Sequence, residues 1–249
     1  MTVSALGLGT ARIGGLGYAR RGDRETTLIP EAVEESKRAV RAAVDRGVSF
    51  FDTADVYGAG RAERLLGEAI RGVRQKLVIA TKFGELFDEE TGKVPDGAVT
   101  PEYVVRACDA SLRRLGIDVI DLYLFHLRSF PLERATGIRD ALEDLVAHGK
   151  IRFYGWSTDD VERARLFAEG RHCTAVEHRL NVLMDAPEML ELCEAKRLGS
   201  VCRVPLLCGA LTGRWGPTRS YRRPTAAATG SATRGSWNCS NEPTHSGRS

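Results

Sequence analysis

The chain has 249 residues, of which 43% are hydrophobic and 28% charged, and its formal net charge is +3. This length fits one (β/α)8 barrel or two smaller domains, and either could bury a large core. The small charge gives no reason to expect nucleic acid or an acidic membrane surface as a partner. No apolar run approaches the roughly 20 residues that cross a bilayer.

As far as Gly213, short apolar runs alternate with amphipathic stretches. The runs suit strands buried on both faces and lie at residues 48–51, 77–80, 119–125, 151–156, 174–176 and 200–204. Helical spacing of apolar residues lies between them, at residues 31–46, 101–115, 136–147 and 159–167. This alternation, without hairpin signals, predicts a parallel sheet. Periodicity alone does not distinguish a closed barrel from an open, doubly wound sheet.

Local signals set the bounds of some elements. Thr100 is a candidate N-cap, Pro101 suits the first turn of a helix, and Gly116 ends that helix. The polar stretch 85–98 contains Gly and Pro and predicts a longer loop after the predicted strand at 77–80.

The composition changes near Gly216. From there to Ser249 the chain is rich in Thr, Ser, Arg, Ala and Gly and has almost no aliphatic residues. Such a segment cannot bury enough apolar surface to offset the cost of ordering. We therefore expect a folded domain at residues 1–215 and a disordered tail at 216–249. A natural tail and the product of a reading-frame shift both remain open.

The six cysteines are scattered, with no C-x-x-C pair and no zinc-like spacing. The first residues lack the charged start and apolar core of a signal peptide. We expect free thiols, no metal site and a cytoplasmic location.

One chemically useful residue follows or ends each successive predicted strand. In a (β/α)8 barrel, the carboxyl ends of the strands form the active-site face. The residues in question are therefore expected to meet in space; they are Asp52, Lys82, His126, Ser157, Glu177 and Pro205.

Several segments are similar to the sequence motifs of one known enzyme family, and they occur in the same order along the chain. Residues 51–58 resemble an FDTAxxYG motif, and residues 80–84 resemble the strand end with its Thr-Lys pair. The others are SLxRLG and DLYLxH at 111–126, GKIRxxGxS at 149–157, and PLxxGxLTG at 205–213. By these motifs the chain resembles an aldo/keto reductase. The resemblance implies a (β/α)8 TIM barrel that is incomplete, with about seven βα units, because nothing after Gly213 resembles the eighth strand.

The resemblance also implies an enzyme that reduces an aldehyde or ketone with NADPH. Tyr57 would be the general acid, since a carbonyl that accepts hydride develops negative charge on oxygen. A free tyrosine has a pKa near 10, and the ammonium of Lys82 would lower it. Asp52 would pair with Lys82, and His126 would hold the substrate oxygen by a hydrogen bond.

For NADP(H), the resemblance assigns three groups of binding residues. Gly9, Thr10 and Asp52 would lie near the nicotinamide ribose, and Ser157, Thr158 and Glu177 near the carboxamide. The pyrophosphate stretch would be lined by Pro205, Leu206, Leu207, Cys208 and Arg214.

Three departures from the family pattern concern cofactor binding. Glu177 stands where the family has glutamine, and Leu180 stands where it has an aromatic residue that stacks on the nicotinamide. The basic motif that would bind the adenosine 2′-phosphate is not found after Gly213. Two alternatives therefore stay open: a non-catalytic or defective member of the family that binds dinucleotide weakly, and an unrelated (β/α)8 enzyme.

Overall fold

The computed structural model describes residues 2–13, 30–90 and 98–213, without the side chains of Pro30 and Cys208. The chain divides into two compact units. Unit 1 comprises Met1–His178 and Pro187–Val201, and unit 2 comprises Arg179–Ala186 and Cys202–Ser249. The predicted boundary at residue 216 and the predicted disorder of 216–249 lie outside the described residues, so both stay predictions.

The strands form one sheet in the order β1-β2-β3-β4-β5-β6-β7. Each neighbouring pair from β1 to β6 is parallel, with Asp52 opposite Gly9 and Ala80, and Ser157 opposite Glu177. The strands are β1 (Gly7–Gly9), β2 (Phe50–Asp52), β3 (Val78–Phe83), β4 (Ile120–Phe125), β5 (Ile151–Ser157), β6 (Cys173–Arg179) and β7 (Gly199–Arg203). The expected parallel sheet is confirmed, and the architecture is that of an incomplete (β/α)8 barrel, with seven strands among the described residues.

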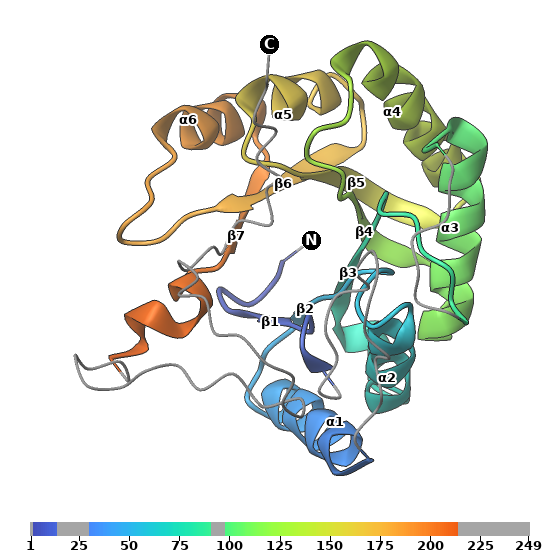
Figure 1. Cartoon of the computed structure of the whole chain (residues 1–249), viewed down its shortest axis with the longest axis vertical. Coiled ribbons are helices and arrows are strands. Elements are labelled where there is room, and N and C mark those ends of the chain that lie inside the picture. The colour runs from blue at the N-terminus through green and yellow to red at the C-terminus, as the bar shows by residue number, and fades with distance from the viewer. Residues whose placement is uncertain (1, 14–29, 91–97, 214–249) are drawn as a thin grey trace, which may run out of the picture. The chain divides into compact units, whose positions relative to one another are not determined.

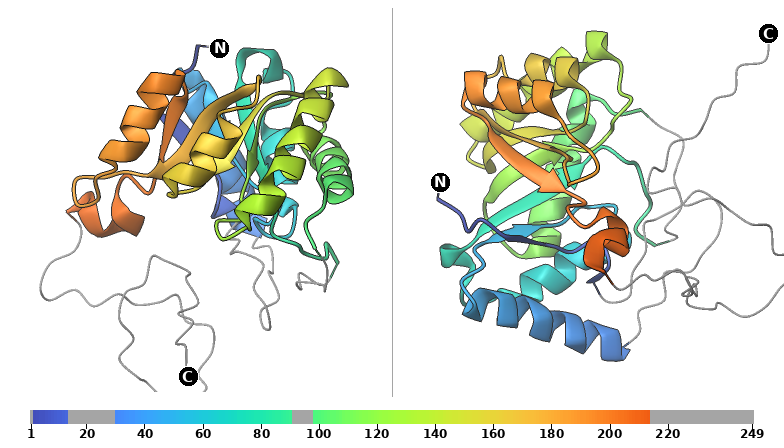
Figure 2. Two further views of the ribbon diagram at one scale, coloured as in Figure 1. Left: turned by 90° about the horizontal axis from the view of Figure 1, so that it is seen from above. Right: turned by 90° about the vertical axis from the view of Figure 1, so that its left-hand side faces the viewer.

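Helices connect the strands and, within unit 1, lie on the outer side of the sheet (Figures 1 and 2). They are α1 (Pro30–Asp45), α2 (Arg61–Ala69), α3 (Pro101–Leu115), α4 (Leu132–Ala147), α5 (Val161–Phe167) and α6 (Pro187–Lys196). Short 3-10 helices are η2 (Arg74–Lys76) and η3 (Leu207–Thr212). None of the described helices is long and apolar enough to cross a membrane.

The ends of α3 are as expected from the sequence. The Thr100 side chain accepts a hydrogen bond from the Tyr103 backbone N–H at 3.3 Å. Gly116 follows the helix with φ of 64°, a left-handed conformation that glycine adopts without steric cost. Cap and stop residues therefore define this helix more sharply than periodicity alone could.

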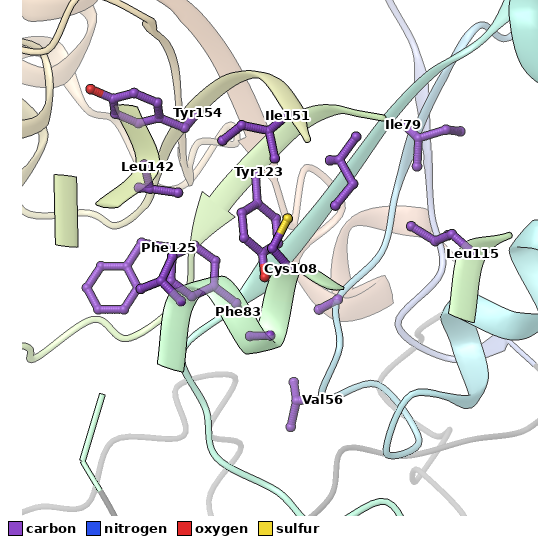
Figure 3. Packing of buried hydrophobic residues seen from close by; sticks show 14 of the residues in the cluster. Val56, Ile79, Phe83, Cys108, Leu115, Tyr123, Phe125, Leu142, Ile151 and Tyr154 are labelled. Carbon is purple, nitrogen blue, oxygen red and sulfur yellow. The ribbon is translucent and has the colours of Figure 1, made fainter. Parts of the chain in front are cut away.

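Alternate residues of β4 face opposite sides of the sheet, as the pleat requires. Tyr123 and Phe125 pack into the layer between sheet and helices, where Cys108 of α3 lies beside Tyr123 (Figure 3). Leu122 and Leu124 join a smaller apolar cluster with Ala80 and Ala175. Because both faces are buried, β4 appears in the sequence as a continuous apolar run.

Two helical glycines, Gly67 in α2 and Gly137 in α4, are predicted to respond to a change to alanine with opposite effects on stability. A Cβ at Gly67 would lie 2.2 Å from the backbone oxygen of Leu115, so Gly67→Ala should lower the free energy of unfolding by about 1–3 kcal/mol. At Gly137 in α4 the nearest atom to a Cβ is 3.8 Å away, so Gly137→Ala should raise that free energy by up to about 1 kcal/mol. Urea unfolding of both variants tests this pair, and shifts of the same sign would contradict it.

Candidate active site

The polar residues at the strand ends come together in unit 1. Asp52 ends β2, Lys82 is the fifth residue of β3, His126 follows β4, Ser157 ends β5 and Glu177 lies in β6. Because these strands are parallel and neighbouring, their carboxyl ends lie at the same edge of the sheet. The clustering expected from the sequence is therefore present for these five residues, whereas Pro205, the sixth, belongs to unit 2.

Lys82 lies at the centre of this cluster, and its side chain is fully buried. Its Nζ lies 2.5 Å from Asp52 Oδ1, donates to the Thr53 backbone oxygen at 3.0 Å, and lies 3.3 Å from Glu177 Oε2. Burial on its own would lower the pKa of Lys82, but the charges of Asp52 and Glu177 outweigh it and hold that pKa well above its usual value. The side chain is therefore an ammonium ion held between two carboxylates.

For the pKa of Asp52, burial outweighs the attraction of the neighbouring ammonium. Burial and the charge of Glu177 raise the pKa of Asp52 to about 7, and the ammonium of Lys82 opposes that rise only in part. Two carboxylates share one ammonium. Between about pH 4 and pH 7, Asp52 in the folded protein therefore retains a proton that an exposed aspartate would release.

This retained proton predicts how stability depends on pH. The unfolded chain releases the Asp52 proton near pH 3.8, and the folded chain releases it near pH 7. Between these values the folded state binds more protons, so the free energy of unfolding should fall as pH rises from about 4 to about 7. Urea unfolding at pH 5 and pH 7.5 should show a smaller fall in Asp52→Asn than in the wild type. An equal or larger fall in the variant would contradict the assignment.

Tyr57 lies in the tight turn after β2 and is nearly buried, with 5% of its surface exposed. Gly58 and Gly60 adopt positive φ angles of 59° and 84°, which let the chain reverse directly into α2. The Tyr57 ring centroid lies 5.3 Å from Lys82 Nζ and 6.1 Å from the His126 ring, which stands at 86° to it. The phenol, the ammonium and the imidazole are thus neighbours, as the sequence predicted.

Of the residues assigned to the cofactor, those in unit 1 lie around the same edge. Gly9 pairs with Asp52, and Thr10 donates to the Asp52 backbone oxygen through both its N–H and its hydroxyl, at 2.8 and 3.0 Å. The Ser157 hydroxyl donates to Glu177 Oε1 at 2.9 Å, and the Thr158 N–H donates to the Glu177 backbone oxygen at 2.9 Å.

Comparison with known proteins agrees with this geometry. A model of the Aldo/keto reductase family matches residues 5–241, beyond the last motif noted in the sequence. This chain belongs to the aldo/keto reductase family. A curated relative, aldo-keto reductase yakc of Schizosaccharomyces pombe, whose name specifies NADP(+), is 34% identical over 195 residues. That match covers 75% of this chain and 56% of the relative, so the chain spans little more than half the length of that protein.

Solved structures of the family are also similar. The holo form of an aldo-keto reductase from Bacillus halodurans has a TM-score of 0.74 at 26% identity, covering 89% of this chain and 69% of that one. An aldo/keto reductase from Klebsiella pneumoniae, solved in complex with NADP and acetate, has a TM-score of 0.64 at 31% identity, covering 84% and 67%.

The remaining predicted cofactor residues are not in unit 1. Pro205, Leu206 and Leu207 belong to unit 2, where they lead into η3, and their role stays a prediction. The side chain of Cys208 and the whole of Arg214 lie outside the described residues.

A second network of buried charged residues joins α2, α3 and β3. It was not predicted from the sequence. Arg114 Nε of α3 donates to Glu63 Oε2 of α2 at 2.6 Å, and Thr81 donates to Glu63 Oε1 at 2.5 Å. Burial raises the pKa of nearby Asp55 well above its usual value, with a further contribution from Glu63. Arg114 belongs to the SLxRLG motif, but no sequence pattern links it to Glu63, which lies 51 residues away in α2.

Proposed function

We propose that this chain is an NADP-dependent oxidoreductase that reduces an aldehyde or ketone to an alcohol, with Tyr57 as the general acid. The observation that carries the proposal is the contact of Tyr57 with a buried ammonium: Lys82 Nζ lies 5.3 Å from the tyrosine ring and is held by Asp52. Membership of the family and the NADP bound to the Klebsiella pneumoniae protein support the choice of cofactor.

The residues present fit a nicotinamide. Glu177 Oε2 is buried and accepts no hydrogen bond from any described residue, so it can accept one from the NH2 of a carboxamide. Ser157, which ends β5 opposite Glu177, and Thr158, whose N–H donates to the Glu177 backbone oxygen, are both buried. When bound, the reduced nicotinamide supplies the hydride.

The chain's own residues would then move the proton. In the proposed mechanism, His126 holds the carbonyl oxygen by a hydrogen bond, and the Tyr57 hydroxyl donates its proton to that oxygen as hydride reaches the carbon. The phenolate left on Tyr57 is stabilised by the Lys82 ammonium, whose position is fixed by Asp52 and the Thr53 carbonyl. The phenolate recovers a proton from water before the next turnover.

The test is oxidation of NADPH by purified protein in the presence of 4-nitrobenzaldehyde, followed as loss of NADPH absorbance. Turnover that requires both the protein and the aldehyde is expected. No turnover by folded protein that nevertheless binds NADPH would favour the second candidate, a family member that binds dinucleotide without catalysis. The observation behind that candidate is that the described residues supply seven strands.

The substrate in this proposal is a small-molecule carbonyl compound. We propose no nucleic-acid partner and no membrane partner, and the cytoplasmic location stays a prediction. Cys108 and Cys173 are buried free thiols.

A further inference from the structure

The cluster around Lys82 contains more negative than positive charge. The charged and titratable groups near Lys82 come from three neighbouring segments: Asp52 from β2, Tyr57 from the turn after it and Glu177 from β6; His126 stands beside Tyr57. When both carboxylates are ionised, one ammonium neutralises only one of them. Glu177 is 4% exposed, so its charge is poorly screened by water.

Glu177 is held so that its charge points into the site. Its Oε1 accepts from Ser157, and this bond turns Oε2 toward Lys82 without giving Oε2 a hydrogen bond. The carboxylate therefore keeps one oxygen for a ligand while remaining within 3.3 Å of the ammonium. A glutamine of the same size could form the same contacts but would carry no charge.

We propose that Glu177 is a second counter-ion of Lys82 and that its charge makes the site prefer the oxidised, positively charged nicotinamide over the reduced, neutral one. This inference rests on the proposed function. A buried, uncompensated negative charge is costly, and a cationic ring placed beside it lowers that cost. Interactions between unit charges several ångströms apart in a partly buried site correspond to a change in binding on the order of tenfold.

The position of the ring relative to Glu177 follows from the proposed reaction. A hydride donor must lie against a carbonyl group that Tyr57 can protonate, and Tyr57 is in contact with Lys82. A donor at that place lies close to both carboxylates of the cluster. The charge of Asp52 is expected to contribute in the same sense above pH 7, because its pKa is raised to about 7.

The preference is tested by binding alone. Dissociation constants for NADP+ and NADPH are measured at pH 8 by quenching of tryptophan fluorescence, with the full chain and its variants Glu177→Gln and Ser157→Ala. In Glu177→Gln, the ratio of the constant for NADP+ to that for NADPH should rise about tenfold. Ser157→Ala keeps the charge of Glu177 but loosens its orientation, so it should weaken both forms and change the ratio much less than Glu177→Gln does. If Glu177→Gln does not fold, Glu177→Met, uncharged and of similar length, carries the same expectation.

The outcomes separate this inference from the proposed function. If the wild type binds both forms and the ratio does not change in Glu177→Gln, the inference is wrong and the proposed function stands. If Ser157→Ala changes the ratio as much as Glu177→Gln does, the effect comes from contacts rather than charge, and the inference is again wrong. If the folded wild type binds neither form, the proposed function is wrong, and the inference that rests on it is wrong as well.

Discussion

Tyr57→Phe is expected to lower kcat for aldehyde reduction by about 10²- to 10⁴-fold, the usual contribution of a positioned general acid. The change removes one hydroxyl from a ring that is 5% exposed, so the packing and the affinity for NADPH should be preserved. Steady-state kinetics with 4-nitrobenzaldehyde measures the first quantity, and fluorescence titration with NADPH measures the second.

Tyr123→Phe is the matched control. Tyr123 is also buried, and its hydroxyl has no hydrogen-bond partner among the described residues. Its ring stacks on Phe83 at 4.4 Å in the layer between sheet and helices. Removing that hydroxyl should leave kcat nearly unchanged. Equal activity in Tyr57→Phe and the wild type, or equal loss in both variants, would contradict the role given to Tyr57.

Lys82→Met is expected to lower the free energy of unfolding by about 3–5 kcal/mol as well as to abolish turnover. The reason is that the variant leaves Asp52 and Glu177 facing each other without the cation that lies 2.5 and 3.3 Å from their oxygens. Urea unfolding at pH 8, above the pKa of about 7 of Asp52, measures the loss. Adding Asp52→Asn to Lys82→Met should recover part of it, because one of the two unpaired charges is then removed.

Lys150→Met is the control for this experiment. Lys150 Nζ also lies 2.5 Å from a carboxylate, that of Asp109, but the two side chains are 34% and 37% exposed. Exposed ion pairs are worth no more than about 1 kcal/mol, so this variant should lose little stability. If Lys82→Met and Lys150→Met lose similar amounts of unfolding free energy, burial does not make the Lys82 ion pairs more important for stability than an exposed pair.

The sequence predicts the parallel sheet and the bounds of α3 well, because buried strands and helix caps leave local signals. It places the ends of β3 and β6 too early. Both strands were expected to stop at their last apolar residue, whereas β3 continues through Lys82 to Phe83 and β6 through Glu177 to Arg179. A charged residue inside a buried strand is tolerated only when a partner neutralises it, and the partner is distant in sequence.

The same limit applies to the site. The positions of Asp52, Tyr57, Lys82 and His126 follow from the strand ends and from the resemblance to the family. The approach of Glu177 to Lys82 depends on a side-chain orientation fixed by Ser157, which no local pattern reveals. Sequence reasoning therefore assigned Glu177 to the cofactor alone and missed its contact with the ammonium. It also missed α2 and α6, which lie between predicted elements.

The most direct test of the account follows the hydride itself. Purified wild-type protein is incubated with 4-nitrobenzaldehyde and NADPH dideuterated at the nicotinamide C4, and the alcohol is analysed by mass spectrometry. We predict one deuterium at the carbinol carbon of the alcohol, with product formation strongly reduced in Tyr57→Phe. Alcohol without deuterium, or none at all from folded protein that binds NADPH, would contradict hydride transfer at this cluster.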